Sequence, residues 1–155
     1  MNLLIRRAKP VEAEVLTEIA HAAKRHWDYP ENWIQHWKPE LTITSEFITD
    51  NEMYVALSGA EIIGCCAITR SGPVAELEHM WIRPEHMGAG VGRALFNHVT
   101  EQAGHLEIPV LELSADPNAA GFYERMGAKR IGEVRSVIEG QPRVLPRMIV
   151  NIVGS

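Results

Sequence analysis

The segment from residue 75 to residue 113 constrains the fold of this chain more than any other part. It reads as a strand over residues 75–82, a glycine-containing turn, an amphipathic helix over residues 91–103 and a short apolar strand over residues 110–113. Such a strand–helix–strand unit implies two parallel strands joined by a right-handed crossover. The sequence therefore predicts a parallel strand pair with a helix packed across it.

The rest of the chain predicts antiparallel neighbours for this unit. Further strands are expected over residues 2–8, 53–57, 61–69, 129–135 and 144–152, and further helices after Pro10 and within residues 27–37, 44–51 and 119–126. Ser58-Gly59 lies between two of these strands and is typical of a hairpin turn. In the helix after Pro10 we expect Val11, Val15, Ile19 and Ala22 to share the apolar face. Together these elements predict an α/β fold: a mixed, mostly antiparallel sheet with helices on both faces.

Length and composition suit one globular domain over residues 1–155, with 46% hydrophobic and 23% charged residues. The net charge of −5 and the lack of a basic cluster argue against a nucleic-acid partner. No apolar run approaches the roughly 20 residues of a membrane span, and the first residues lack the order of a signal peptide. Adjacent Cys65 and Cys66 suit two buried thiols in a reducing compartment, so we expect a cytoplasmic protein.

Three alternating glycines, Gly88, Gly90 and Gly92, stand between the strand and the helix. Glycine lets backbone N–H groups approach a ligand closely, and a helix N-terminus adds unsatisfied donors and a positive dipole end. The combination suits a pyrophosphate, with Arg93 adding charge. The run lacks the Gly-Lys-Ser/Thr ending of a P-loop, and its G-x-G-x-G spacing differs from the dinucleotide fingerprint. Taken alone, the glycines are also compatible with a turn that binds nothing.

The residues around these glycines resemble the acetyl-CoA-binding motif of the GNAT superfamily of N-acyltransferases. Residues 87–92 fall on its [R/Q]-x-x-G-x-[G/A] pattern, although Met87 replaces the usual Arg or Gln. A second family motif, a helix with a tyrosine followed by Gly and a strand, is similar to residues 116–133. Residues 143–150 resemble a common family ending. The likeness covers nearly the whole chain, with the motifs in the family's order.

The resemblance implies an N-acetyltransferase that transfers the acetyl group of acetyl-CoA to a primary amine within one ternary complex, without a metal. It also implies that the strands at residues 76–82 and 110–113 splay apart at the centre of the sheet, with acyl-CoA in the gap. A backbone N–H near residues 80–82 would bind the acetyl carbonyl, and Tyr123 would protonate the leaving thiolate. The acetyl-CoA contacts expected from the resemblance are Met80, Trp81, Ile82, Met87, Gly88, Ala89, Gly90, Val91, Gly92, Arg93, Asn118, Phe122 and Tyr123.

Two departures from the family pattern affect these contacts. Met87 removes one side-chain contact to phosphate, so we expect weaker binding of the cosubstrate rather than none. Asp116 stands where the family has an asparagine, and Asn118 follows two residues later. Asn118 either takes over the cosubstrate contact or belongs only to the Asp-Pro-Asn start of a helix.

The general base is expected among the acidic residues of the strand at 75–82. An amine attacks a thioester only when neutral, and the pKa of a lysine-like amine is about 10.4, so a protein group or water must take its proton. Glu76 and Glu78 share one strand face with Met80, while His79 is expected on the other face. Either glutamate is a candidate for the base, and His79 is a third; alternatively, the glutamates only solvate a strand end.

The acceptor amine is not identified by the sequence, and it belongs to a small molecule, a peptide or a protein. The aromatic residues Trp27, Tyr29, Trp33 and Trp37 fall in the region that covers the acceptor side in the family. Aromatic faces attract a cationic amine, but the same residues also serve as hydrophobic cover for a sheet. The acidic net charge favours a basic acceptor. The alternative to an enzyme is a non-catalytic acyl-CoA-binding or regulatory module with the same fold. The sequence does not show the oligomeric state, and a homodimer is one of the states it allows.

Overall fold

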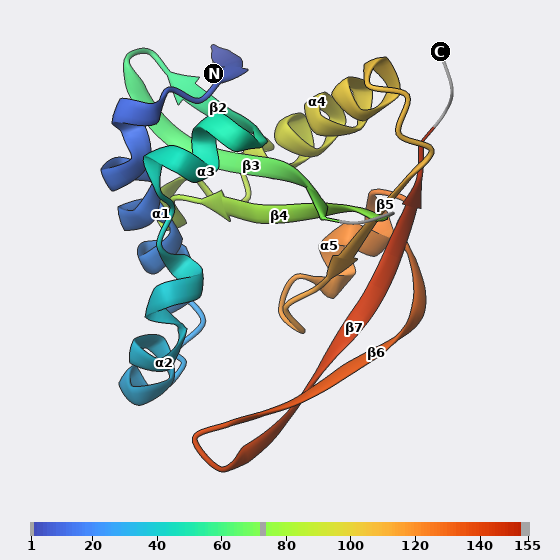
Figure 1. Ribbon diagram of the computed structural model, residues 1–155. Helices are drawn as coiled ribbons and strands as arrows, with labels where there is room; N and C mark the ends of the chain where they lie inside the picture. The colour runs from blue at the N-terminus through green and yellow to red at the C-terminus, as the bar shows by residue number, and fades with distance from the viewer. Residues whose placement is uncertain (1, 72–73, 153–155) are drawn as a thin grey trace.

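The computed structural model describes residues 2–71 and 74–152, and its strands form one seven-stranded sheet (Figure 1). The strand order is β1-β2-β3-β4-β5-β7-β6. All neighbouring pairs are antiparallel except β4 and β5. The strands are β1 (Leu3–Arg7), β2 (Glu52–Ser58), β3 (Glu61–Ser71), β4 (Val74–Ile82), β5 (Val110–Ser114), β6 (Lys129–Ile138) and β7 (Gln141–Asn151).

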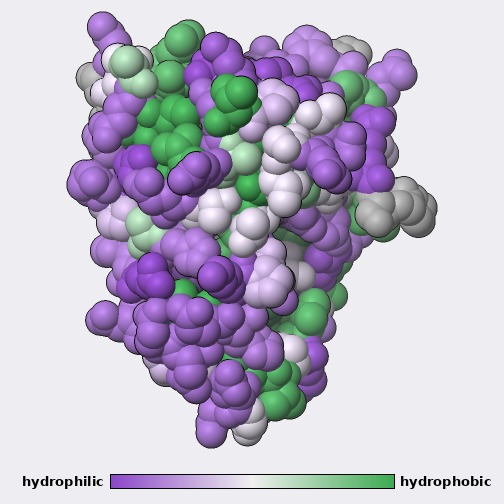
Figure 2. Space-filling view, turned by 60° about the vertical axis from the view of Figure 1, so that its left-hand side comes forward, coloured by the Kyte–Doolittle hydropathy of each residue, from purple (hydrophilic) through white to green (hydrophobic). Residues whose placement is uncertain are grey.

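Helices cover both faces of this sheet, as the sequence predicts (Figure 1). They are α1 (Ala13–Arg25), α2 (Glu31–Leu41), α3 (Ser45–Asp50), α4 (Val91–His105) and α5 (Ala120–Arg125), with 3-10 turns η1 (Pro10–Glu12) and η2 (Pro84–His86). The surface on the α1–α3 side is mainly hydrophilic (Figure 2). None of the helices in the described ranges is long and apolar enough to cross a membrane.

Two hydrophobic cores lie on the two faces of the sheet. The α4 core contains Leu95, Val99 and Cys66, while the α1–α3 core contains Ile19 and Cys65. The two adjacent thiols are therefore buried on opposite faces, because successive strand residues alternate in direction. Both cysteines are free, as the sequence predicts.

The buried face of the first helix differs from the prediction. Val11 is 89% exposed because it belongs to the separate turn η1 and not to α1. The residues of α1 that are buried are Leu16, Ile19, Ala20, Ala23 and Lys24. This places a charged residue, Lys24, on the inner face of the helix, where the sequence pattern gave no reason to expect one.

β4 and β5 are paired only at their beginnings. Their parallel register contains Ala75 with Leu111 and Glu76 with Glu112, and it goes no further. Beyond Glu76 the two strands diverge, which confirms the predicted splay at the centre of the sheet. The N-terminus of α4, at Val91, follows the free end of β4 through η2.

A bulge interrupts β4 just beyond this divergence. The β3–β4 register shifts between Cys65 and Ala67, so His79 and Met80 together lie opposite Cys66. His79 has a φ of +54°, in the left-handed region that a residue with a side chain rarely adopts. Such a bulge re-aims the side chains that follow it.

The bulge overturns two expectations about side-chain direction. Met80 packs against the α4 core, whereas Glu76 and Glu78 alternate with residues of that core and point to the α1–α3 side. The prediction that Met80 shares the face of the two glutamates is therefore wrong. The prediction that His79 lies on the face opposite the glutamates is also wrong. Its ring contacts Phe47 of α3, on the α1–α3 side, with a distance of 5.1 Å between the ring centroids.

The β6–β7 hairpin extends well beyond the other strands and reaches the helices on the α1–α3 side (Figure 1). Most of β6 is exposed, but Ile138 at its end is buried in the α1–α3 core. In the next residue, Oε1 of Glu139 lies 4.0 Å from Nδ1 of His36 in α2. The hairpin thus carries β7 across from the centre of the sheet to α2.

Candidate functional site

A cleft with a volume of about 1260 Å³ lies where β4 and β5 separate. Its walls come from β4, the loop before α4, the segment from β5 to α5, the inner face of α1 and the β7 strand. The glutamates of β4, the glycines before α4 and Tyr123 all line it. The structure therefore gathers in one cleft the residues that the sequence placed in three separate motifs.

Tyr123 is buried in α5, and it lines the cleft. The hydroxyl makes no hydrogen bond to another described residue. Among the described side chains, every deeply buried nitrogen or oxygen atom has a hydrogen-bond partner, so this unpaired hydroxyl must have access to the cleft. Burial raises the pKa of Tyr123 well above its usual value, and the nearby Cys66 and Asp116 act in the same direction. The side chain is therefore a protonated donor at neutral pH.

The two candidate bases have different surroundings. Glu76 forms an ion pair with Arg147 of β7, and Arg147 also contacts Glu112 at 3.1 Å. Burial raises the pKa of Glu78, and the negative charge of Glu76 adds to this shift, while Arg147 opposes it. Glu76 is thus ion-paired with an arginine, whereas Glu78 lies in surroundings that raise its pKa and so favour its protonated form.

His79 is poorly suited to act as a base. Its Nδ1 accepts a hydrogen bond of 3.1 Å from Nε1 of Trp81, which occupies the lone pair on that nitrogen. Burial lowers the pKa of His79 to about 4, so the imidazole is neutral at pH 7 and a weak proton acceptor. Trp81 packs against the α1–α3 core, on the opposite side of β4 from Met80 and Ile82.

The loop before α4 presents backbone donors to the cleft. Gly88 and Gly90 have φ values of +80° and +86°, which a side chain would strain, and Gly90 is the N-cap of α4. The N–H of Met87 already donates to the carbonyl of Pro84 at 3.2 Å, so the amides free of such turn bonds begin at Gly88. Of the other residues expected here, Arg93 lines the cleft, Ala89 is exposed, and Val91 points into the α4 core.

Gly92 has a packing role that the glycine pattern did not reveal. A Cβ atom at this position would lie 3.3 Å from the ring of Phe122 in α5. The absence of a side chain therefore allows α5 to approach the first turn of α4. Because Phe122 precedes Tyr123, this contact fixes the position of the tyrosine relative to the free amides.

Asp116 is the centre of a hydrogen-bonded cluster between β5 and α5. It accepts hydrogen bonds from Lys24 at 2.8 Å, Arg143 at 3.2 Å and the Tyr29 hydroxyl at 2.9 Å. Burial opposes its ionisation, but the charge and hydrogen bond of Lys24, with the donors of Asn118 and Tyr29, hold the pKa of Asp116 below its usual value. The ionised carboxylate joins α1, the α1–α2 loop and β7 to the start of α5.

Asn118 is part of this cluster. Its backbone N–H donates to Asp116 at 2.9 Å, and its side-chain amide donates to Asp116 at 3.0 Å and to the Tyr29 oxygen at 3.1 Å. These bonds favour the second of the two interpretations of Asn118, in which it belongs to the start of the helix.

The aromatic residues of the acceptor side already hold cations of the chain itself. Nζ of Lys24 lies 4.2 Å from the centroid of the Trp37 ring. Cζ of Arg143 lies 4.9 Å from the ring centroids of both Trp37 and Tyr29. Trp37 is buried in the α1–α3 core, and Trp33 packs against it. These contacts favour the interpretation of the aromatic residues as cover for the sheet.

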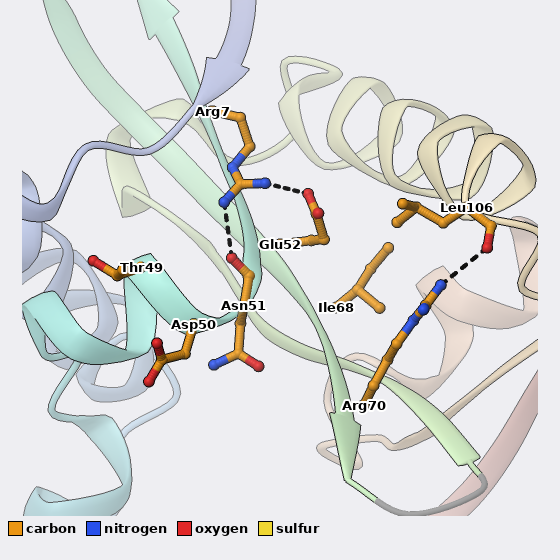
Figure 3. A pocket seen from close by; sticks show the side chains of 8 residues that line it. All are labelled: Arg7, Thr49, Asp50, Asn51, Glu52, Ile68, Arg70 and Leu106. Carbon is orange, nitrogen blue, oxygen red and sulfur yellow. Dashed lines mark hydrogen bonds and ion pairs between the residues drawn. The ribbon is translucent and has the colours of Figure 1, made fainter.

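A second, smaller hollow of about 190 Å³ lies at the other end of the sheet (Figure 3). In it Arg7 is bound to Glu52 and to the carbonyl of Asn51, and Arg70 is bound to the carbonyl of Leu106. It contains none of the site residues expected from the sequence. Its two arginines are engaged within the protein, so the cleft at β4 and β5 is the better candidate site.

The model of the acetyltransferase (GNAT) family matches residues 16–128 of this chain. The chain belongs to the GNAT acetyltransferase family. The match includes the parts of the cleft wall from α1 to α5, while the β7 part lies beyond it. The chain is therefore an N-acetyltransferase by family, and the comparisons give no support to the non-catalytic alternative.

The similarity to known proteins extends over nearly the whole chain. A peptidyl-lysine N-acetyltransferase, YjaB, from Salmonella typhimurium is 28% identical over 152 residues, which cover 96% of this chain and 99% of the relative. Among solved structures, the PaiA N-acetyltransferase of Thermoplasma acidophilum, in complex with coenzyme A, has a TM-score of 0.78 at 20% identity, covering 97% of this chain and 99% of that one. The structure of the yncA protein of Salmonella typhimurium, with acetyl-CoA, has a TM-score of 0.74 at 17% identity. The similarity covers 100% of this chain and 96% of that one. These structures confirm the fold.

Four charged residues of the site were not found by sequence reasoning. Lys24, Arg125, Arg143 and Arg147 line or adjoin the cleft, yet none stands in a recognisable pattern with its partners. Lys24 and Asp116, for example, are 92 residues apart. Arg125, Arg143 and Arg147 lie in the segments that resemble family motifs, but the resemblance assigned no role to them, and Lys24 carried no signal.

Proposed function

We propose that the chain transfers the acetyl group of acetyl-CoA directly to a primary amine. The observation that carries this proposal is the cleft between β4 and β5, in which free amides, a protonated tyrosine and a carboxylate with a raised pKa face the same space. The coenzyme A and acetyl-CoA of two structural relatives support the choice of cosubstrate.

The chain would hold acetyl-CoA through the loop before α4. The amides from Gly88 to Gly92 and the N-terminus of α4 suit the pyrophosphate, and Arg93 and Arg125 add positive charge to the same cleft. Met87 contributes only an apolar side chain there. Beyond Glu76, N–H groups of β4 on the β5 side have no partner strand, so one near Met80 can donate to the acetyl carbonyl.

Acetyl-CoA supplies a thioester with an electrophilic carbonyl carbon. Glu78 would take a proton from the acceptor ammonium, directly or through water, so that a neutral nitrogen can attack. As the C–N bond forms and the C–S bond breaks, Tyr123 would donate its proton to the sulfur. The nitrogen, now bonded to the acetyl carbon, loses its second proton, which restores the Tyr123 hydroxyl directly or through water. Glu76, paired with Arg147, would hold its charge beside Glu78 and keep the pKa of Glu78 raised.

A covalent acetyl-cysteine is not expected. Burial raises the pKa of Cys65 to about 12 and that of Cys66 well above its usual value, so neither is a thiolate at neutral pH. Neither cysteine lines the cleft. These features support direct transfer in a ternary complex.

The proposal is tested by release of free thiol from acetyl-CoA with a panel of amines: free amino acids, lysine peptides and simple alkylamines. We expect release that requires both an amine and the intact chain. If no amine increases release above that with acetyl-CoA alone, while acetyl-CoA binds, the proposed function is wrong. The cytoplasmic location, the single domain and the homodimer stay predictions.

Replacing Tyr123 with phenylalanine should lower kcat about tenfold and leave the Kd of acetyl-CoA unchanged. The change removes only the hydroxyl, and a coenzyme A thiolate is a fairly good leaving group, so the loss should fall at or below the low end of general acid catalysis. Kinetics over a range of amine concentrations measure kcat, and calorimetry measures Kd. Full activity in Tyr123→Phe would remove the tyrosine from the mechanism.

Gly90→Asp should weaken acetyl-CoA binding about tenfold or more, because it sets a negative charge and a side chain among the free amides. The matched control is Gly140→Asp, in the β6–β7 turn: Gly140 also has a positive φ, of +78°, with open space where a Cβ would lie. Both variants suffer the backbone strain, and only the first affects the anion site. Equal affinities in the two variants would contradict the assignment.

A further inference from the structure

Two cations in the wall of the cleft share a single carboxylate. Nζ of Lys24 lies 2.8 Å and Nη2 of Arg143 lies 3.2 Å from the same oxygen of Asp116. The exposed fractions of the Lys24 and Arg143 side chains are 11% and 10%. Within the described residues, no other carboxylate lies within ion-pair distance of either cation, so the cluster carries one positive charge in excess.

Arg143 has unused donors that open into the cleft. Its Nη2 donates to Asp116 and to the Tyr29 hydroxyl, whereas Nε and Nη1 donate to no described residue. No deeply buried side-chain nitrogen in the described structure lacks a partner, so these two nitrogens have access to solvent. Arg143 lines the cleft, and aromatic rings cover its guanidinium at 4.9 Å. Its open edge therefore faces the cleft.

Other acidic groups of the cleft leave this excess charge in place. Burial lowers the pKa of Lys24, and the charge and hydrogen bond of Asp116 oppose that shift. Glu40 also favours the charged form of Lys24, but it is exposed and water screens its charge. Glu76 is paired with Arg147, and Glu78 belongs to the site of the reacting amine. The cleft therefore has a carboxylate-lined region on β4 and a cationic region at Arg143 and Lys24.

We propose that Arg143 and Lys24 form a subsite for a carboxylate that the acceptor carries on the same molecule as its amine. This inference rests on the proposed function. The planar guanidinium binds a carboxylate through paired N–H donors, and the adjacent ammonium adds charge in a site of low water content. The amine end of the acceptor then lies toward Glu78. Such an acceptor is a free amino acid, or a lysine peptide with an acidic neighbour.

The test compares acceptors that carry this carboxylate with their neutral amide analogues, at a pH where each amine's own pKa is taken into account. Free amino acids are paired with their amides, and lysine peptides with Asp or Glu beside the lysine are paired with the Asn or Gln versions. We expect kcat/KM to be at least tenfold higher for the acidic member of one series. Preference in the first series alone identifies a free amino acid, and preference in the second alone identifies a peptide. Equal rates within both series would overturn the subsite.

Arg143→Gln should abolish this preference and leave the Kd of acetyl-CoA unchanged. The Lys24–Asp116 pair remains in that variant, so the cluster keeps its internal bond. The control is Arg135→Gln in the same hairpin, where the arginine side chain is 78% exposed and lies outside the cleft. A preference that survives Arg143→Gln, or that disappears equally in Arg135→Gln, would contradict the proposal.

A binding measurement separates this inference from the proposed function. Hexanoate, which has no amine, should change the fluorescence of Trp37 and Trp33, whose rings lie 4.9 and 6.0 Å from the Arg143 guanidinium. Hexanamide should not, and Arg143→Gln should lose the hexanoate response. The result is independent of turnover: failure of every amine to release thiol would overturn the acetyltransferase mechanism, whereas a missing hexanoate response would overturn the subsite alone.

Discussion

Glu78→Gln should lower kcat/KM at pH 7 by about a hundredfold or more, the largest loss of activity expected from a single substitution in this cleft. General base catalysis contributes 10²–10⁴-fold, and Glu78 is the carboxylate whose pKa burial and Glu76 raise toward a useful range. With a lysine peptide as acceptor, the loss should shrink as pH rises toward the amine's own pKa of about 10.4, because the amine then loses its proton to solvent. A pH–rate profile of both proteins measures this recovery.

The stability of the same variant distinguishes a catalytic role from a structural one. A carboxyl whose pKa is raised on folding costs folding free energy when ionised, above its ordinary pKa of about 4.3. Glu78→Gln removes that cost, so Tm at pH 7 should stay unchanged or rise. The matched control is Glu76→Gln, which leaves Arg147 paired with Glu112 and should lose much less activity. If Glu76→Gln loses more activity than Glu78→Gln, the assignment of the base is reversed.

Asp116→Ala should reduce the free energy of unfolding by about 3 kcal/mol, the low end for breaking a buried ion pair. The substitution leaves Lys24 and Arg143 buried beside each other without their shared carboxylate. For a protein of this size, Tm should fall by roughly 2–4 °C per kcal/mol. Thermal unfolding by calorimetry measures the shift. The control is Asp50→Ala at the exposed end of α3, which should change stability by about 0.5 kcal/mol or less.

The pH dependence of this effect has a definite sign. The pKa of Asp116 is lower in the folded state than its ordinary value of about 3.9, so the stabilisation is complete above that pH. It is lost as pH falls through the folded pKa. The difference in stability between the parent protein and Asp116→Ala should therefore be constant from pH 5 to pH 7 and decrease below about pH 4. A difference that grows on acidification would contradict the role of the ionised carboxylate.

The sequence predicted the parts of the fold that depend on local patterns. The parallel unit over residues 75–113 followed from a period-2 strand, glycines and a period-3.6 helix, and the splay followed from the family resemblance. α2 was predicted too short, since Pro39 argues against a helix beyond Trp37, yet the helix continues to Leu41. The bulge at His79 was not predicted, because the alternation rule assumes that every residue of a strand reverses direction.

The site was predicted only as far as its motifs extend. Tyr123, the glycines and the glutamates stand in patterns, so the sequence could propose them. It could not distinguish Glu76 from Glu78, since Arg147 decides between them and comes from a strand 71 residues away. Nor could it show that Lys24 and Arg143 converge on Asp116, because that depends on how α1 and β7 pack around the start of α5.

The burial of Cys65 and Cys66 on opposite faces gives the protein two built-in reporters of local opening. Neither thiol can react with an alkylating reagent until the helices that cover it move away. Cys65 becomes accessible when α1–α3 detach from the sheet, and Cys66 when α4 detaches. The labelling rates of two consecutive residues would thus measure, separately, how often the α1–α3 layer and the α4 layer open.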